Sequence, residues 1–261
     1  MRKLSLTAAF LVLVAAPVAL ALPVNHGTFN GTNVQFQNVT ETTQTLGDDE
    51  CLFTAPNGNP GDGACAGAPL VSGDSLFFFP TSFGATATGL GGADTTHSLL
   101  SMLVAANPLT TVDQLLINEF GDVILAGIGT PTTNASVSMS GFVTVLNTQS
   151  MVGIGTVVPF SGTFTPKSTY SLNGDVGTTL WTGSVLVDIA AALPNGDATL
   201  VQLQFNNVLN AFSEDGTSAT IQKKVVSGPA FAVTIIPEPA TVSLLGLGLL
   251  GMVLLKRSGA R

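Results

Sequence analysis

Residues able to do acid–base or nucleophilic chemistry are few in this chain. The two histidines are His26 and His97, and the second lies in Asp94–Ser98 beside both aspartate and serine. A Ser-His-Asp triad depends on side chains that meet in space, and no Gly-x-Ser-x-Gly elbow accompanies this segment. Two carboxylates could hydrolyse a glycoside, but we expect solvated, turn-like positions for the glutamates Glu41, Glu50, Glu119 and Glu214. The sequence therefore predicts no catalytic residues, and a secreted hydrolase remains an alternative.

The tripeptide Pro237-Glu238-Pro239 is suited to proteolytic processing. Both prolines fix φ and disfavour helix in the preceding residue, so an extended segment is expected here. The uncharged run 240–255 follows, enough for a helix of about 24 Å against a hydrocarbon core of about 30 Å. A basic stop then marks the cytoplasmic side of the membrane: Lys256, Arg257 and Arg261. We predict a transmembrane helix over 240–255, with the body of the chain outside.

Taken together, the tripeptide, the apolar run and the basic tail of residues 236–261 resemble the PEP-CTERM sorting signal. The resemblance implies recognition by an exosortase, a membrane transpeptidase of bacteria that make extracellular polysaccharide. Ser258, Gly259 and Ala260 interrupt the basic tail, which is a small departure from the pattern. A plain single-span anchor is the alternative. A GPI signal would end in its apolar tail, and a Leu-Pro-x-Thr-Gly sortase box is absent from the sequence.

The first residues read as a secretory signal peptide. Arg2 and Lys3 precede an apolar stretch from Leu4 to Ala16, and Ala19 and Ala21 form an A-x-A cleavage site. We predict a signal peptide over 1–21 and a mature chain outside the cytoplasm; a short N-terminal membrane anchor is the alternative.

Export gives the two cysteines a specific role. Cys51 and Cys65 are the only cysteines, and a disulfide between them would stabilise the fold by roughly 3 kcal/mol in the loop-entropy model. The loop between them, Asn57–Gly63, alternates Asn and Asp as calcium ligands do, but no bidentate glutamate follows. We expect a disulfide-closed surface loop, with calcium binding as the alternative, and we predict no metal and no cofactor.

The charge of the body excludes some partners. Residues 22–235 hold only Lys167, Lys223 and Lys224 as basic side chains, with no arginine, against fifteen acidic residues. Nucleic-acid binding needs clustered Lys and Arg at the phosphates, so a nucleic-acid partner is excluded.

Alternating strands must position these residues. Three runs repeat with period two, Val34–Val39, Val137–Val145 and Ala198–Phe205, and Trp181–Ile189 and Ala230–Ile235 also read as strands. The polar stretch Asn118–Asp122 separates two apolar runs, Val112–Ile117 and Val123–Ile128, in the manner of a hairpin turn. We predict an all-β fold, with residues 22–235 forming a single antiparallel β-sandwich that is jelly-roll-like.

These features predict an exported, non-catalytic surface or extracellular-matrix protein. It would be membrane-anchored before an exosortase-like enzyme acts, and associated with extracellular polysaccharide or biofilm afterwards. The alternative is a carbohydrate- or calcium-dependent binding module. Sugar stacking would need an exposed Trp181 or Tyr170, and we expect Trp181 to be buried because it lies in an alternating run.

Overall fold

The computed structural model describes residues 23–44, 52–54, 67–223 and 231–236. The predicted signal peptide with Ala19 and Ala21, the tail 237–261, and both Cys51 and Cys65 with the loop between them lie outside the described residues. In the part that is described, no helix has the length and apolar character needed to cross a membrane. The domain boundaries, the disulfide and the span over 240–255 therefore stay predictions.

Period-two alternation produces the strands. In Ala198–Phe212 the side chains of Val201, Leu203 and Phe205 are buried, whereas the amides between them reach the outer face. Alternation of this kind places every second side chain on the same face of a strand. The strands predicted within 34–39, 137–145, 181–189, 198–205 and 230–235 are all present.

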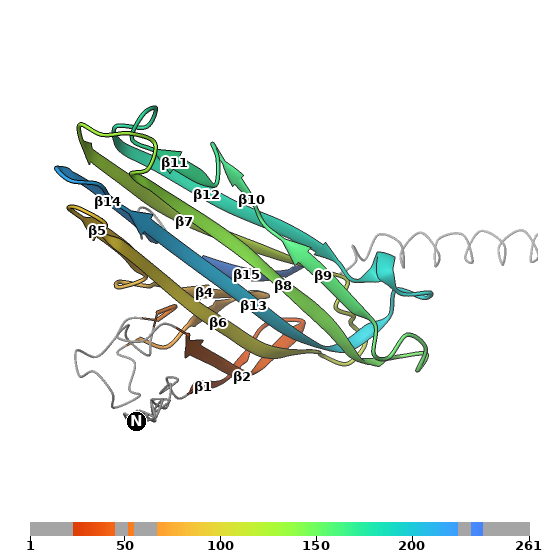
Figure 1. Ribbon diagram of the computed structural model, residues 1–261. Helices are drawn as coiled ribbons and strands as arrows, with labels where there is room; N and C mark the ends of the chain where they lie inside the picture. Colours follow the sequence, from red (N-terminus) through yellow and green to blue (C-terminus); the bar gives the residue numbers. More distant parts are fainter. Residues whose placement is uncertain (1–22, 45–51, 55–66, 224–230, 237–261) are drawn as a thin grey trace, which may run out of the picture.

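Within the described ranges the strands form two sheets in which every pairing is antiparallel (Figure 1). The first sheet runs, in spatial order, β1 (Val24–Asn30), β2 (Val34–Thr43), β6 (Ala93–Ala106), β13 (Ala198–Phe212), β8 (Asn134–Thr148) and β11 (Thr169–Ser171), with β9 (Val157–Ser161) also on β8. The second runs β10 (Thr163–Thr165), β12 (Gly177–Asp188), β7 (Gln114–Gly127), β15 (Phe231–Ile236), β4 (Ser75–Phe78) and β3 (Leu70–Ser72). Its β7 also pairs with β14 (Thr217–Lys223), which pairs in turn with β5 (Gly84–Thr88).

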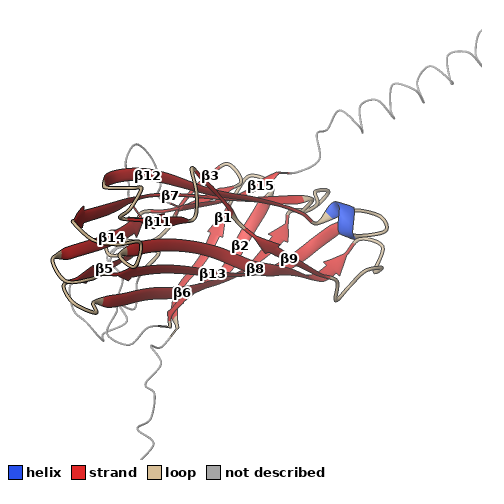
Figure 2. Cartoon of the chain, turned by 45° about the horizontal axis from the view of Figure 1, so that its top comes forward, coloured by secondary structure: helices blue, strands red, loops and turns tan. Residues whose placement is uncertain are grey.

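The two sheets lie face to face, as the layered view in Figure 2 shows, and the 3-10 helix η1 (Ala190–Ala192) lies at one end of the layers. Aromatic side chains fill part of the space between them. The Phe53 ring lies 5.1 Å from the Phe83 ring and 5.0 Å from that of Phe231, which in turn lies 5.0 Å from Phe205. The predicted antiparallel sandwich is confirmed, and its jelly-roll-like connection order stays a prediction.

The predicted hairpin at Asn118–Asp122 is wrong. β7 continues through this stretch as one strand, and β12 pairs with it from Gly177 opposite Leu125 to Asp188 opposite Gln114. The polar residues resembled a turn because such residues dominate turns. They stay in the strand because their backbone pairs with β12 on one side and with β15 and β14 on the other.

Candidate functional site

Three polar side chains meet between the sheets, each at an inward position of its strand. Glu119 follows Leu115 and Ile117 on β7, Lys223 follows Ala219 and Ile221 on β14, and Asn207 lies between Phe205 and Leu209 on β13. We name Glu119, Lys223 and Asn207 the central triad. Two of its members belong to the second sheet and Asn207 to the first, so the triad spans the core.

Two glycines make room for the central triad. Gly183 lies opposite Glu119 on β12, where an added Cβ would lie 2.7 Å from the Glu119 Cγ. Gly121 lies opposite both Trp181 and Lys223, and a Cβ there would lie 2.2 Å from the Trp181 ring. Glycine inside a strand often marks such a close approach. The two glycines therefore let Trp181 and the Glu119 carboxyl pack against the β7–β12 pair.

The central triad is joined through a single oxygen atom. Asn207 Nδ2 donates to Glu119 Oε2 at 2.6 Å, and Lys223 Nζ donates to the same atom. The side chains of Glu119 and Lys223 have no exposed surface. Aromatic rings surround the amine, with Lys223 Nζ lying between 5.0 and 6.0 Å from four ring centroids, those of Phe53, Phe83, Trp181 and Phe231.

Burial changes the ionisation of this pair. Desolvation raises the pKa of Glu119 above its ordinary value, although the Lys223 charge and the hydrogen bonds from Lys223 and Asn207 act in the opposite direction. Desolvation lowers the pKa of Lys223, and the Glu119 charge only partly offsets it. Both shifts favour the neutral forms. A neutral amine is a nucleophile and a neutral carboxyl group is a proton donor, roles that the charged forms do not have.

The central triad also holds unused hydrogen-bonding capacity. Among the described residues, Glu119 Oε1, Asn207 Oδ1 and Trp181 Nε1 are buried without a hydrogen-bond partner. Buried polar atoms in proteins are nearly always paired, and each exception calls for an explanation.

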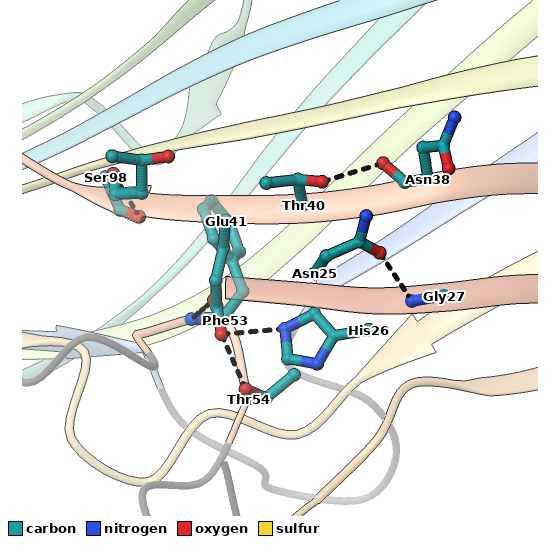
Figure 3. A network of polar contacts seen from close by, with 10 residues as sticks. Asn25, His26, Gly27, Asn38, Thr40, Glu41, Phe53, Thr54 and Ser98 are labelled. Carbon is teal, nitrogen blue, oxygen red and sulfur yellow. Dashed lines mark hydrogen bonds and ion pairs between the residues drawn. The ribbon is translucent and has the colours of Figure 1, made fainter. Parts of the chain in front are cut away.

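A second buried glutamate, Glu41 on β2, has a different environment (Figure 3). Its Oε1 lies 3.0 Å from His26 Nε2 and accepts from the Thr54 hydroxyl at 2.6 Å, while Oε2 accepts from the Phe53 backbone N–H at 2.8 Å. Four groups lie in this arrangement, which we name the Glu41 cluster: Glu41, His26, Thr54 and the Phe53 amide. It attaches residues 52–54 to the first sheet.

The solvated positions expected for the glutamates are therefore wrong for Glu41 and Glu119, which are both completely buried. Glu214 is reached by solvent and accepts hydrogen bonds from Thr130 and Thr133, while Glu50 lies outside the described residues. The signal that could have found the central triad is alternation, because continuing each period-two pattern places all three residues on the inward face.

The other candidate residues are placed separately. Trp181 is buried as expected, and Tyr170 is buried too, with its hydroxyl donating to the Lys167 carbonyl. His97 lies on the outer face of β6, where its Nε2 is 3.3 Å from Asn206 Oδ1. Within the described ranges, no three His, Cys, Asp or Glu side chains gather as metal ligands would.

The predicted sorting tripeptide directly follows β15. This strand pairs with β7 on one side and β4 on the other, and its last residue, Ile236, lies opposite Gln114. Pro237, Glu238 and Pro239 begin at the next residue and lie outside the described part, as do Lys256, Arg257 and Arg261. The last strand before the tripeptide is thus an interior strand of the second sheet.

Some solved structures resemble the chain distantly. TmCBM61 in complex with beta-1,4-galactotriose is 7% identical over 56% of this chain and 70% of its own, with a TM-score of 0.22. The enzymatically active domain of bacteriophage CBA120 tailspike protein 4 is 13% identical over 82% of this chain and 22% of its own, with a TM-score of 0.21. The family 11 xylanase from Neocallimastix patriciarum is 8% identical over 82% of this chain and 99% of its own, with a TM-score of 0.18. TM-scores of this size lead to no conclusion about ligand or activity.

Sequence comparison is informative at the C-terminus. No curated protein matches the chain. Residues 236–258 match the family described as the PEP-CTERM protein-sorting motif, a range that contains Pro237, Glu238, Pro239, Lys256 and Arg257. The chain therefore carries a PEP-CTERM protein-sorting motif at its C-terminal end.

Proposed function

We propose that this chain is an exported, non-catalytic surface or extracellular-matrix protein, sorted by an exosortase-like membrane transpeptidase that recognises Pro237-Glu238-Pro239. The observation that carries the proposal is the sorting-motif match over residues 236–258. The apolar run 240–255 anchors the precursor in the membrane, and Lys256, Arg257 and Arg261 hold its end on the cytoplasmic side. Processing then delivers the body to the cell surface or to a matrix of extracellular polysaccharide.

The position of β15 supports this role. Its pairing continues to Ile236, so processing at the tripeptide would leave every described strand in place. The body also holds fifteen of the sixteen acidic residues and no arginine, which suits a soluble acidic surface protein.

The test is to follow a body-tagged chain in a host that contains the transpeptidase. Wild-type protein should lose residues 240–261 and leave the membrane fraction, whereas Glu238→Ala should leave unprocessed precursor in the membrane, because the only charge of the tripeptide is lost. Asp215→Ala, which changes an exposed acid of the body, is the matched control and should be processed normally. Mature wild-type protein that retains the tail, together with no effect of Glu238→Ala, would reduce the tail to a plain anchor.

Association with polysaccharide is tested separately. The processed protein should co-sediment with the extracellular polysaccharide of its host. Washing with salt should not release it, because salt screens charged contacts and leaves uncharged ones in place. Recovery of all the protein in the polymer-free supernatant would contradict this part of the proposal.

A further inference from the structure

The central triad combines an amine, a carboxamide and a carboxyl group in a place that water does not reach. Lys223 Nζ and Asn207 Nδ2 both donate to Glu119 Oε2, so one oxygen holds the amine beside the carboxamide. The three strands that supply these groups come from both sheets. We propose that Lys223 and Asn207 become joined by an intramolecular amide bond, an isopeptide cross-link between the sheets, and that Glu119 transfers the proton while it forms.

The bond-forming step is balanced without any further reactant. The lone pair of neutral Lys223 Nζ attacks Asn207 Cγ while the Glu119 carboxyl donates a hydrogen bond to Oδ1. A proton then passes from Nζ through Glu119 to Nδ2, the Cγ–Nδ2 bond breaks, and ammonia leaves. One C–N bond forms and one breaks, nothing is oxidised or reduced, and Glu119 ends the step in the state in which it began.

Three features of the site favour this chemistry. The aromatic rings around Nζ exclude water, which favours the neutral amine and protects the reaction from hydrolysis. The raised pKa of Glu119 and the lowered pKa of Lys223 favour the uncharged forms that the step requires. Holding the reacting groups in one geometry also removes much of the entropic barrier of an amide-forming reaction.

The product accounts for atoms that a plain ion pair leaves unused. Within the described part of the chain, Glu119 Oε1 and Asn207 Oδ1 are buried without hydrogen-bond partners, although Oε2 and Nδ2 of the same two side chains are hydrogen-bonded to each other. In the cross-linked form the new amide N–H donates to one Glu119 oxygen, and the protonated carboxyl donates to the amide carbonyl. The linked amide nitrogen also cannot take up a proton, so no buried charge can form on the Lys223 side chain.

Peptide mass spectrometry of the purified full chain tests the proposal. Cleavage after glutamate separates Asn207, in the fragment beginning at residue 120, from Lys223, in the fragment beginning at residue 215. After denaturation the two fragments should remain linked, with a mass equal to their sum less one ammonia molecule. Separate, unmodified fragments would overturn the inference, and so would fragments linked to Glu119 with loss of one water molecule.

Variants assign the roles. Lys223→Arg and Asn207→Ala should abolish the linked fragment, and Glu119→Gln should do so while keeping the side-chain volume. Lys167→Arg is the control, since Lys167 Nζ lies at the surface 2.5 Å from Asp175, and its linked fragment should persist. The emission of the single tryptophan, Trp181, reports whether each variant is folded. A linked fragment of unchanged yield in folded Glu119→Gln would remove Glu119 from the step. None of these readouts depends on processing of the tail.

Discussion

The central triad and the Glu41 cluster place a glutamate in two buried settings of opposite character. Glu41 receives three donors or potential donors, His26, the Phe53 amide and the Thr54 hydroxyl, and both of its oxygens are used. Glu119 accepts from two donors at one oxygen, and its other oxygen has no hydrogen-bond partner among the residues that the structure describes. Burial alone therefore does not identify a reactive carboxyl group. The two glutamates differ in the completeness of their hydrogen bonds and in the amine that lies beside Glu119 alone.

The largest expected effect on stability is that of Lys223→Met, which removes the amine that Glu119 and Asn207 contact and leaves the Glu119 carboxyl group buried without it. Removal of one partner from a buried Glu–Lys pair costs about 3–5 kcal/mol, so the free energy of unfolding in urea should fall by that amount. The double variant Glu119→Gln with Lys223→Met should recover part of this loss, because no buried carboxyl group is then left without its partner. Lys167→Met, at the partly exposed pair with Asp175, should cost no more than about 1 kcal/mol. An equal fall in the free energy of unfolding for Lys223→Met and Lys167→Met would contradict the prediction that the buried pair matters more than the surface pair.

A smaller decrease in the free energy of unfolding is expected for Glu41→Gln. The glutamine amide keeps one acceptor oxygen, but its NH₂ group faces the Phe53 N–H or the Thr54 hydroxyl, which are themselves donors in the wild type. An unsatisfied buried polar group costs about 1–3 kcal/mol of folding free energy. The free energy of unfolding should fall, and the segment around Phe53 should also open more often. Hydrogen exchange of the Phe53 amide, which donates to Glu41 Oε2, should therefore become faster. Protected exchange at Phe53 in this variant would mean that packing, and not the carboxylate, holds the segment. Thr40→Ala, on the outer face of the same strand, is the matched control.

The smallest effect concerns Glu214, a solvent-accessible glutamate. Hydrogen bonds from the Thr130 backbone and hydroxyl, and from Thr133, lower the pKa of Glu214 below the ordinary value of 4.5. A carboxyl group whose pKa is lower in the folded state stabilises that state at pH values above its unfolded-state pKa. This contribution is lost as the pH falls through the folded-state pKa. The stability difference between wild type and Glu214→Gln should therefore shrink on acidification below 4.5. A difference that stays constant with pH would show that the Glu214 charge has no part in it.

The sequence predicts several of the strands but not the central triad, for a physical reason. Alternation is local, so β2, β8 and β13 could be predicted from a few residues each. The polar composition of Asn118–Asp122 predicts a turn, whereas its strand character comes from backbone pairing with β12, β14 and β15, which are distant in the sequence. A polar residue at an inward position can be recognised from period two alone. Its partner cannot, since the partner is defined by how the two sheets pack.

The attachment of β15 has a mechanical consequence. The strand is bonded to β7 along its whole length and to β4 through Phe231–Thr234, and it ends at Ile236, where the sorting motif begins. Tension on the chain from that point acts along the strand, so both ladders are loaded in shear and their hydrogen bonds resist together. Resistance to such a pull is set by the rate of forced unfolding and not by equilibrium stability. A pull on β15 from Ile236 is therefore resisted by both ladders together.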